Sequence, residues 1–188
     1  KPLYFFTDRL LAATAIKFLP HSVTPNLVTA FRFLTIPFIF FFLIFGYYVW
    51  SAALFLLAVF TDVLDGALAR TTNRITDWGK LFDPLADKLL VGSTAAVLVT
   101  QFLSFKLAVA IVAAELLLIL LAYYHKYYRH RDIQANYLGK TKMVLQSLGL
   151  TALYSAVLNS SPLVLRLAEG TLMAALVFAI LSFFGYRS

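Results

Sequence analysis

A series of long apolar runs is the feature that most limits how this chain can fold. Six hydrophobic stretches follow one another at about 27–48, 50–70, 80–100, 105–124, 143–157 and 163–186, and short polar segments separate them. A helix that crosses a membrane needs about 20 mostly apolar residues. Only 13% of the 188 residues are charged, roughly half the share in an ordinary soluble domain. The pattern predicts an all-α integral membrane protein of one domain over 1–188, with a bundle of six transmembrane helices over 26–188.

The segment before the first run has a different character. Within residues 1–20, apolar residues recur at helical spacing between Arg9 and Lys17, without the unbroken apolar core of a signal peptide. We expect an amphipathic helix that lies in the membrane interface. The chain has no cysteine, so disulfides, iron–sulfur clusters and thiol nucleophiles are excluded.

The distribution of lysine and arginine predicts how the bundle is oriented. With six spans, one side of the membrane receives only Lys106 and Arg166, and nearly all other basic residues fall on the opposite side. Positively charged loops stay in the cytoplasm, so both termini should be cytoplasmic. The formal charge of +7 would attract anionic lipids and phosphorylated substrates to that face, although transporters and channels show the same bias.

Four carboxylates are the strongest functional signal, because acidic residues in membrane spans are costly and usually functional. Asp62 and Asp65 share a helical face near the end of the second run, and Asp83 and Asp87 share one near the start of the third. A short connection makes these two helices antiparallel, so the four side chains should converge near the cytoplasmic surface.

Carboxylates gathered in a medium of low dielectric repel one another unless a cation is bound among them. A site with only oxygen ligands fits Mg²⁺ or Mn²⁺ that also contacts substrate phosphates. The alternative is that the aspartates cap helices or pair with Arg70, Arg74 and Lys88. Gly66 and Gly79 lie beside the carboxylates and would let phosphate approach the backbone, or would allow close helix packing.

The stretch TDVLDGALARTTNRITDWGKLFDPLADK resembles the signature of the CDP-alcohol phosphatidyltransferase family. All eight motif positions are filled at the expected spacing, by Asp62, Asp65, Gly66, Ala69, Arg70, Gly79, Asp83 and Asp87. The family is also built from six membrane helices with an amphipathic helix before them. The resemblance implies an enzyme of phospholipid biosynthesis that transfers a phosphatidyl group from CDP-diacylglycerol to an alcohol and releases CMP.

The resemblance also implies roles for individual residues. Asp62, Asp65, Asp83 and Asp87 would hold two Mg²⁺ or Mn²⁺ ions, and Asp87 would also be the general base. Six residues would contact the cytidine diphosphate: Gly66, Arg70 and Gly79 in the motif, and Asn26, Thr29 and Arg32 in the first helix. For those in the first helix, a helix cap and an arginine that reaches the membrane surface are equally good interpretations.

The acceptor alcohol is predicted from a separate basic cluster. Lys140, Lys142 and Arg131 lie at the predicted cytoplasmic side and could hold a phosphorylated acceptor. The segment Leu138-Gly139-Lys140-Thr141-Lys142 is similar to one in phosphatidylglycerolphosphate synthases, which favours glycerol 3-phosphate. Ala114 stands before Glu115 where those synthases usually have an arginine. Inositol phosphate, an amino alcohol and phosphatidylglycerol, as in cardiolipin synthases, remain alternatives.

The resemblance further implies a homodimer in the bacterial inner membrane, with an active site that faces the cytoplasm and no nucleic-acid partner. A cation or proton transporter is the main alternative of another class, since it also uses intramembrane carboxylates. It would place them near the bilayer midplane and show an inverted repeat, and the sequence has neither. A catalytically inactive scaffold would not need all eight motif positions.

Overall fold

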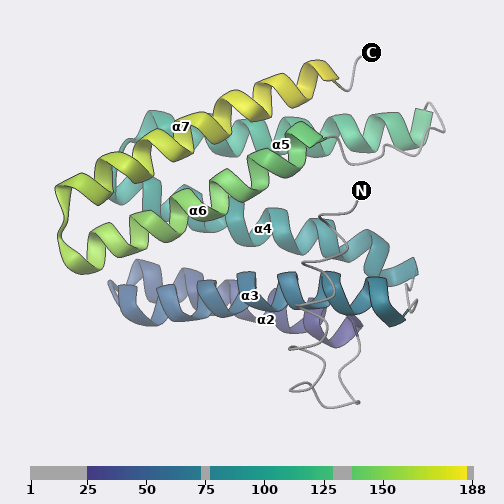
Figure 1. Ribbon diagram of the computed structural model, residues 1–188, viewed down its shortest axis with the longest axis horizontal. Helices are drawn as coiled ribbons and strands as arrows, with labels where there is room; N and C mark the ends of the chain where they lie inside the picture. The colour runs from purple at the N-terminus through teal and green to yellow at the C-terminus, as the bar shows by residue number, and fades with distance from the viewer. Residues whose placement is uncertain (1–24, 73–76, 129–136, 186–188) are drawn as a thin grey trace.

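The computed structural model describes residues 25–72, 77–128 and 137–185, and the side chains of 30–61, 85–121, 123–124 and 137–183. This part of the chain folds into helices only (Figure 1), which confirms the all-α prediction. In order they are α2 (Pro25–Ile44), α3 (Tyr48–Thr72), α4 (Asp77–Phe102), α5 (Phe105–Tyr128), α6 (Tyr137–Asn159) and α7 (Pro162–Gly185). Each corresponds to one predicted apolar run, with ends that agree to within a few residues except that α6 begins at Tyr137, well before the run expected from about 143. The amphipathic helix expected over 1–20 lies outside the described residues.

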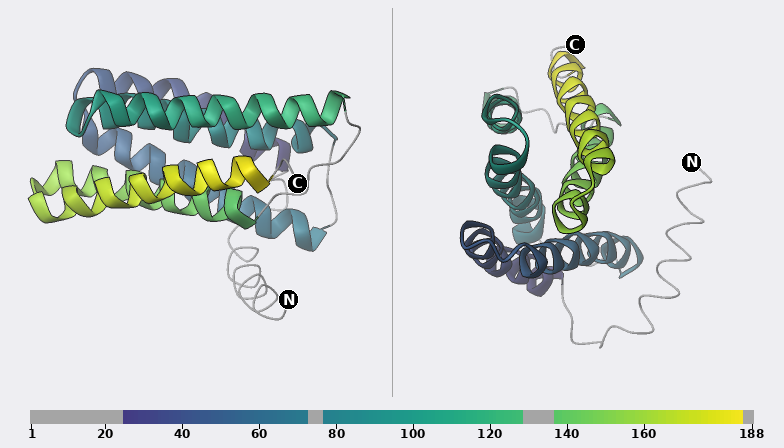
Figure 2. Two further views of the ribbon diagram at one scale, coloured as in Figure 1. Left: turned by 90° about the horizontal axis from the view of Figure 1, so that it is seen from above. Right: turned by 90° about the vertical axis from the view of Figure 1, so that its left-hand side faces the viewer.

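The helices pack as three pairs of chain neighbours. α2 pairs with α3, α4 with α5, and α6 with α7, as the end-on view in Figure 2 shows. Further contacts join the pairs, because α2 also packs against α4, α6 against α3 and α4, and α5 against α7. The α4 helix, which carries half of the acidic motif, therefore contacts helices from both other pairs.

Two tight turns follow directly from the sequence. Gly46 has a φ of 78° and ends α2, where Tyr47 N–H donates to Phe42 O at 2.8 Å and Gly46 N–H donates to Leu43 O at 3.2 Å. This is the Schellman arrangement, which favours glycine because other residues are strained at that φ. At the start of α7, Val164 N–H donates to Ser161 Oγ, and Pro162 occupies the first helical position. Serine followed by proline is a typical start of a helix.

Large apolar side chains cover much of the outer surface as well as the core. Phe55, Leu98, Leu153 and Leu172 are fully buried in an apolar core to which all three helix pairs contribute. More than half of the surface of other large apolar side chains is exposed, among them Leu34, Phe45, Trp50, Phe105, Leu120 and Leu163. Soluble proteins rarely expose apolar area on this scale. The helices are therefore suited to an apolar surrounding.

Length and composition single out two helical stretches that could cross a membrane. Within the described residues these are Leu85–Phe102 in α4 and Pro162–Phe183 in α7. Ala30–Ile44 and Tyr48–Thr61 are shorter apolar stretches. The predicted membrane character is thus supported by two helices and by the exposed apolar surface.

The α6–α7 pair is packed closely at Gly149. A Cβ atom at position 149 would lie 2.8 Å from Leu172 Cγ and 3.3 Å from Leu172 N. Both distances are shorter than ordinary van der Waals contacts, and the second involves the backbone of the facing helix. Glycine at this position therefore sets how closely α6 approaches α7.

We expect Gly149→Ala to destabilise the protein, because α6 and α7 must move apart to make room for the added methyl group. Overpacking of this kind costs about 1–3 kcal/mol. The melting temperature in detergent measures the effect. Gly92→Ala is the matched control, since a Cβ atom there meets nothing within 4 Å. Equal melting temperatures for the two variants would contradict the close contact.

Candidate active site

The backbone brings the two halves of the acidic motif to one end of the bundle. The first half lies in the last turns of α3 and the second in the first turns of α4. α3 ends at Thr72 and α4 begins at Asp77, so the connection allows these helix ends to be at most about 18 Å apart. Side chains are not described for the motif residues Asp62, Asp65, Gly66, Ala69, Arg70, Gly79 and Asp83, whose predicted contacts with metal and nucleotide stay predictions.

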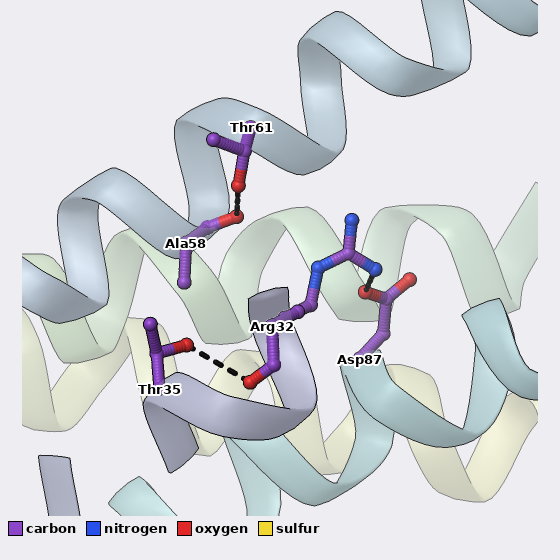
Figure 3. Close-up of polar contacts among 5 residues, drawn as sticks. All are labelled: Arg32, Thr35, Ala58, Thr61 and Asp87. Carbon is purple, nitrogen blue, oxygen red and sulfur yellow. Dashed lines mark hydrogen bonds and ion pairs between the residues drawn. The ribbon is translucent and has the colours of Figure 1, made fainter. Parts of the chain in front are cut away.

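Asp87 is the one motif residue with a described side chain, and it forms an ion pair with Arg32. Arg32 Nη1 donates to Asp87 Oδ1 at 2.6 Å, as Figure 3 shows. The Arg32 side chain is 0% exposed, whereas that of Asp87 is 19% exposed. A buried guanidinium is unfavourable unless it is paired. The predicted base is therefore held from one side by a buried cation and keeps a solvent-accessible part.

The position of Arg32 follows from the buried stripe of α2. Arg32, Thr35, Ile39 and Leu43 are all buried and are spaced three or four residues apart, which places them on one helical face. α2 packs against both α3 and α4. Arg32 is the first described member of this stripe and lies beside Asp87 of α4. Thr35 Oγ1 donates to Arg32 O at 2.9 Å, within the same helix (Figure 3).

A second buried ion pair joins α5 to α6. Lys142 Nζ donates to Glu115 Oε1, and both side chains are less than a tenth exposed. Lys88, the residue after Asp87 on α4, interacts electrostatically with both. Gln146 lies one turn after Lys142 on α6 and is also buried. This cluster of Lys88, Glu115, Lys142 and Gln146 brings together side chains of three helices.

The two described lysines that were predicted for the acceptor lie in different surroundings. Lys142 belongs to the buried cluster, whereas Lys140 is exposed and lies over the Tyr137 ring of its own helix, 6.0 Å from the ring centroid. Arg131 lies outside the described residues. The side chains of Asn26 and Thr29 are likewise not described. Among the residues with described side chains, no group of three or more acidic or histidine residues is arranged to hold a metal ion.

Sequence reasoning missed both ion pairs. Arg32 was predicted to contact nucleotide, and the structure places it against Asp87 instead of leaving it on an open surface. Glu115 carried a usable signal, because a charged residue in the middle of an apolar run needs a partner. Nothing in the sequence identified Lys142 as that partner. Gln146 gave no signal, since one amide in a helix is commonplace.

A family model described as CDP-alcohol phosphatidyltransferase matches residues 22–183. The chain belongs to the CDP-alcohol phosphatidyltransferase family. The matched region contains all described helices up to Phe183, including both ion pairs and the whole acidic motif. The resemblance inferred from the motif is confirmed.

Several bacterial relatives share one name, CDP-diacylglycerol–glycerol-3-phosphate 3-phosphatidyltransferase. The protein from Mycoplasma genitalium is 35% identical over 144 residues, which are 71% of this chain and 61% of that protein. The one from Rickettsia felis is 40% identical over 84 residues, 41% of this chain and 44% of that protein. The one from Salmonella choleraesuis is 34% identical over 134 residues, 67% of this chain and 73% of that protein. The chain thus spans only part of the length of each.

We expect Arg32→Met to lower the free energy of unfolding, because it leaves the Asp87 carboxylate beside an apolar side chain. Removing one partner of a buried pair costs about 3–5 kcal/mol, and the partial exposure of Asp87 favours the lower end. Chemical or thermal unfolding in detergent measures the loss. Arg166→Met is the control, since Arg166 is exposed on α7.

The double variant Arg32→Met with Asp87→Asn should recover part of that stability, because it removes both charges. The loss of unfolding free energy in the double variant is compared with the summed losses of the two single variants. If the double variant loses as much as that sum or more, the ion pair is not what holds Arg32 in place.

Proposed function

We propose that this chain transfers the phosphatidyl group of CDP-diacylglycerol to the hydroxyl of glycerol 3-phosphate, in a metal-dependent reaction that forms phosphatidylglycerol phosphate and CMP. The observation that carries the proposal is the complete acidic motif on α3 and α4, with Asp87 oriented by Arg32, in a chain of this family. The shared name of the relatives supports this choice of donor and acceptor.

The donor set of the motif fits a magnesium-type site. Asp62, Asp65, Asp83 and Asp87 offer only carboxylate oxygens, from two helices whose adjoining ends are close along the chain. Hard divalent cations such as Mg²⁺ and Mn²⁺ prefer such ligands. We assign these four residues to a site for two ions. When bound, the ions would neutralise charge on the diphosphate and on the departing CMP.

The reaction needs a base, because an alcohol is a weak nucleophile at neutral pH. In the proposed step, the acceptor oxygen forms a bond to the phosphorus of the lipid phosphate as its proton passes to the Asp87 carboxylate. The bond between that phosphorus and the CMP oxygen breaks, and CMP leaves. Arg32 donates to Asp87 Oδ1 and so fixes the orientation of the carboxylate.

Recognition of the donor is assigned to the motif and to the start of the first helix. Gly66 and Gly79 would allow the diphosphate to approach the backbone, and Arg70 would neutralise part of its charge. Asn26 and Thr29 lie in the first turns of α2, ahead of Arg32 on the same helix. We propose that Asn26 and Thr29 line the nucleotide pocket and that Arg32 lies at the bottom of this pocket.

Recognition of the acceptor is assigned to Lys140, Lys142 and Arg131. Lys142 is held by Glu115, which leaves its ammonium group oriented within the cluster that also contains Lys88. Two lysines and one glutamate give the cluster a net positive charge, which suits a phosphorylated acceptor. The same metal motif would serve inositol phosphate, an amino alcohol or phosphatidylglycerol as acceptor. The assignment of these three basic residues therefore concerns which acceptor is bound, and the type of reaction does not depend on it.

We further propose that all six helices cross the bacterial inner membrane, with both termini and the active site on the cytoplasmic side. The exposed apolar side chains on every described helix pair support a lipid-facing surface. The exposed Lys106 and Arg166 lie near the starts of α5 and α7, at the end opposite to the motif. A lipid substrate then has its acyl chains in the bilayer and its nucleotide in the cytosol. A homodimer remains a prediction of the family resemblance.

Release of CMP tests the proposed function. The purified protein is incubated with CDP-diacylglycerol and Mg²⁺, and glycerol 3-phosphate, inositol phosphate, serine and phosphatidylglycerol are offered separately. Of the four acceptors, we expect only glycerol 3-phosphate to cause release of CMP. This release should stop when Mg²⁺ is chelated. Asp87→Asn should lower the rate at least 100-fold, the usual range for a general base.

The control is Asp77→Asn, which changes an acidic residue at the start of α4 that is not a motif position. CMP release with another acceptor would overturn the choice of glycerol 3-phosphate but keep the reaction class. Full activity in Asp87→Asn would overturn the assignment of the base.

A further inference from the structure

A small, partly open cavity lies between α5, α6 and α7. Three polar residues line it, namely Glu115, Lys142 and Gln146, and its other lining residues are alanine, leucine and isoleucine. The space open to the centre of a water molecule is ≈ 10 Å³. A cavity needs about 10–15 Å³ by this measure to hold one water. The cavity therefore has the size of a single-water site.

Two buried polar atoms of the lining residues have no protein partner. Within the part of the chain whose side chains are described, neither Glu115 Oε2 nor Gln146 Nε2 forms a hydrogen bond. Glu115 is 5% exposed and Gln146 is 2% exposed, so bulk solvent does not reach them. Buried polar groups in native proteins nearly always have a partner, because leaving them unpaired is unfavourable. Both atoms therefore call for a ligand.

The chemistry of these atoms limits what the ligand can be. Glu115 Oε2 only accepts a hydrogen bond and Gln146 Nε2 only donates one, so the ligand must do both. A further cation would lie beside the Lys142 ammonium group, and an anion would lie beside the Glu115 carboxylate. A neutral molecule of one heavy atom that both donates and accepts is water.

We propose that one buried water molecule occupies this cavity, donates to Glu115 Oε2 and accepts from Gln146 Nε2. It links α5 to α6 beside their ion pair, and through it Gln146 is a positioning residue for Glu115 and Lys142. This inference rests on the cavity and its polar atoms and does not depend on the proposed function. Lys142 and Gln146 are one turn apart, so the ion pair and the water bridge both connect this turn of α6 to Glu115 on α5.

An experimental structure of the full chain in lipid, at about 2 Å resolution or better, tests the proposal directly. We expect a density peak for one water within about 3.2 Å of both Glu115 Oε2 and Gln146 Nε2. The peak should be lost in Gln146→Met, which has nearly the same length and no donor. A dry cavity in the parent protein, or a direct bond from the Gln146 amide to Glu115 Oε2, would overturn the proposal.

The melting temperature gives a second readout that needs no structure. Gln146→Met removes the donor and leaves the Glu115 oxygen without its bridge, so we expect a fall of about 2–8 °C. Gln101→Met is the matched control, because Gln101 is exposed near the end of α4 and should melt within about 1 °C of the parent. A Gln146→Met protein as stable as this control would show that no bridging water stabilises the cluster.

Discussion

Burying charged side chains inside a bundle of apolar helices is unfavourable in free energy, and in this protein two ion pairs offset it. Arg32 with Asp87 joins α2 to α4, and Lys142 with Glu115 joins α5 to α6. Each charge would be strongly unfavourable alone in such surroundings. The pairs therefore connect side chains of different helices, and they involve the carboxylate that we propose as the base and a buried lysine. The proposed chemistry depends on this, because an oriented carboxylate and an oriented ammonium group are both products of the pairing.

The two pairs have different surroundings, and this difference separates their proposed roles. Asp87 is partly exposed and is paired with the buried Arg32. Glu115 and Lys142 are both buried, and Gln146 and a cavity for one water lie next to them. The first pair thus contains the carboxylate that we propose as the base. The second pair belongs to a buried polar cluster in which Glu115 orients Lys142.

Much of the fold could be predicted from the sequence, because the apolar runs are long and are separated by strong turn signals. Gly46 and the Ser161-Pro162 pair end and begin helices for reasons that act over a few residues, so local reasoning finds them. The pairing of Arg32 with Asp87 joins residues 55 positions apart. It depends on which face of α2 packs against α4, and helical periodicity does not determine that. Gln146 is even harder to predict from the sequence, since its proposed role in binding a water molecule depends on a cavity between three helices.

The candidate site was predicted as a set of residues but not as a set of contacts. The spacing of the four aspartates placed them on two helices that follow each other in the chain, and the family match includes them all. Arg32 shows why contacts are harder to predict than residues, because its position in the sequence fits both nucleotide recognition and support of the base. Its pairing with Asp87 is seen only in the structure, since Asp87 lies on another helix.

Binding of CDP-diacylglycerol to the protein in lipid nanodiscs, with and without Mg²⁺, tests the central claim most directly. We expect saturable binding that requires Mg²⁺ and that is competed by CDP, because the nucleotide diphosphate and the metal would share the aspartate site. Binding that is absent, or that is unchanged when Mg²⁺ is removed, would contradict the assignment of this motif to a metal-dependent CDP-lipid site.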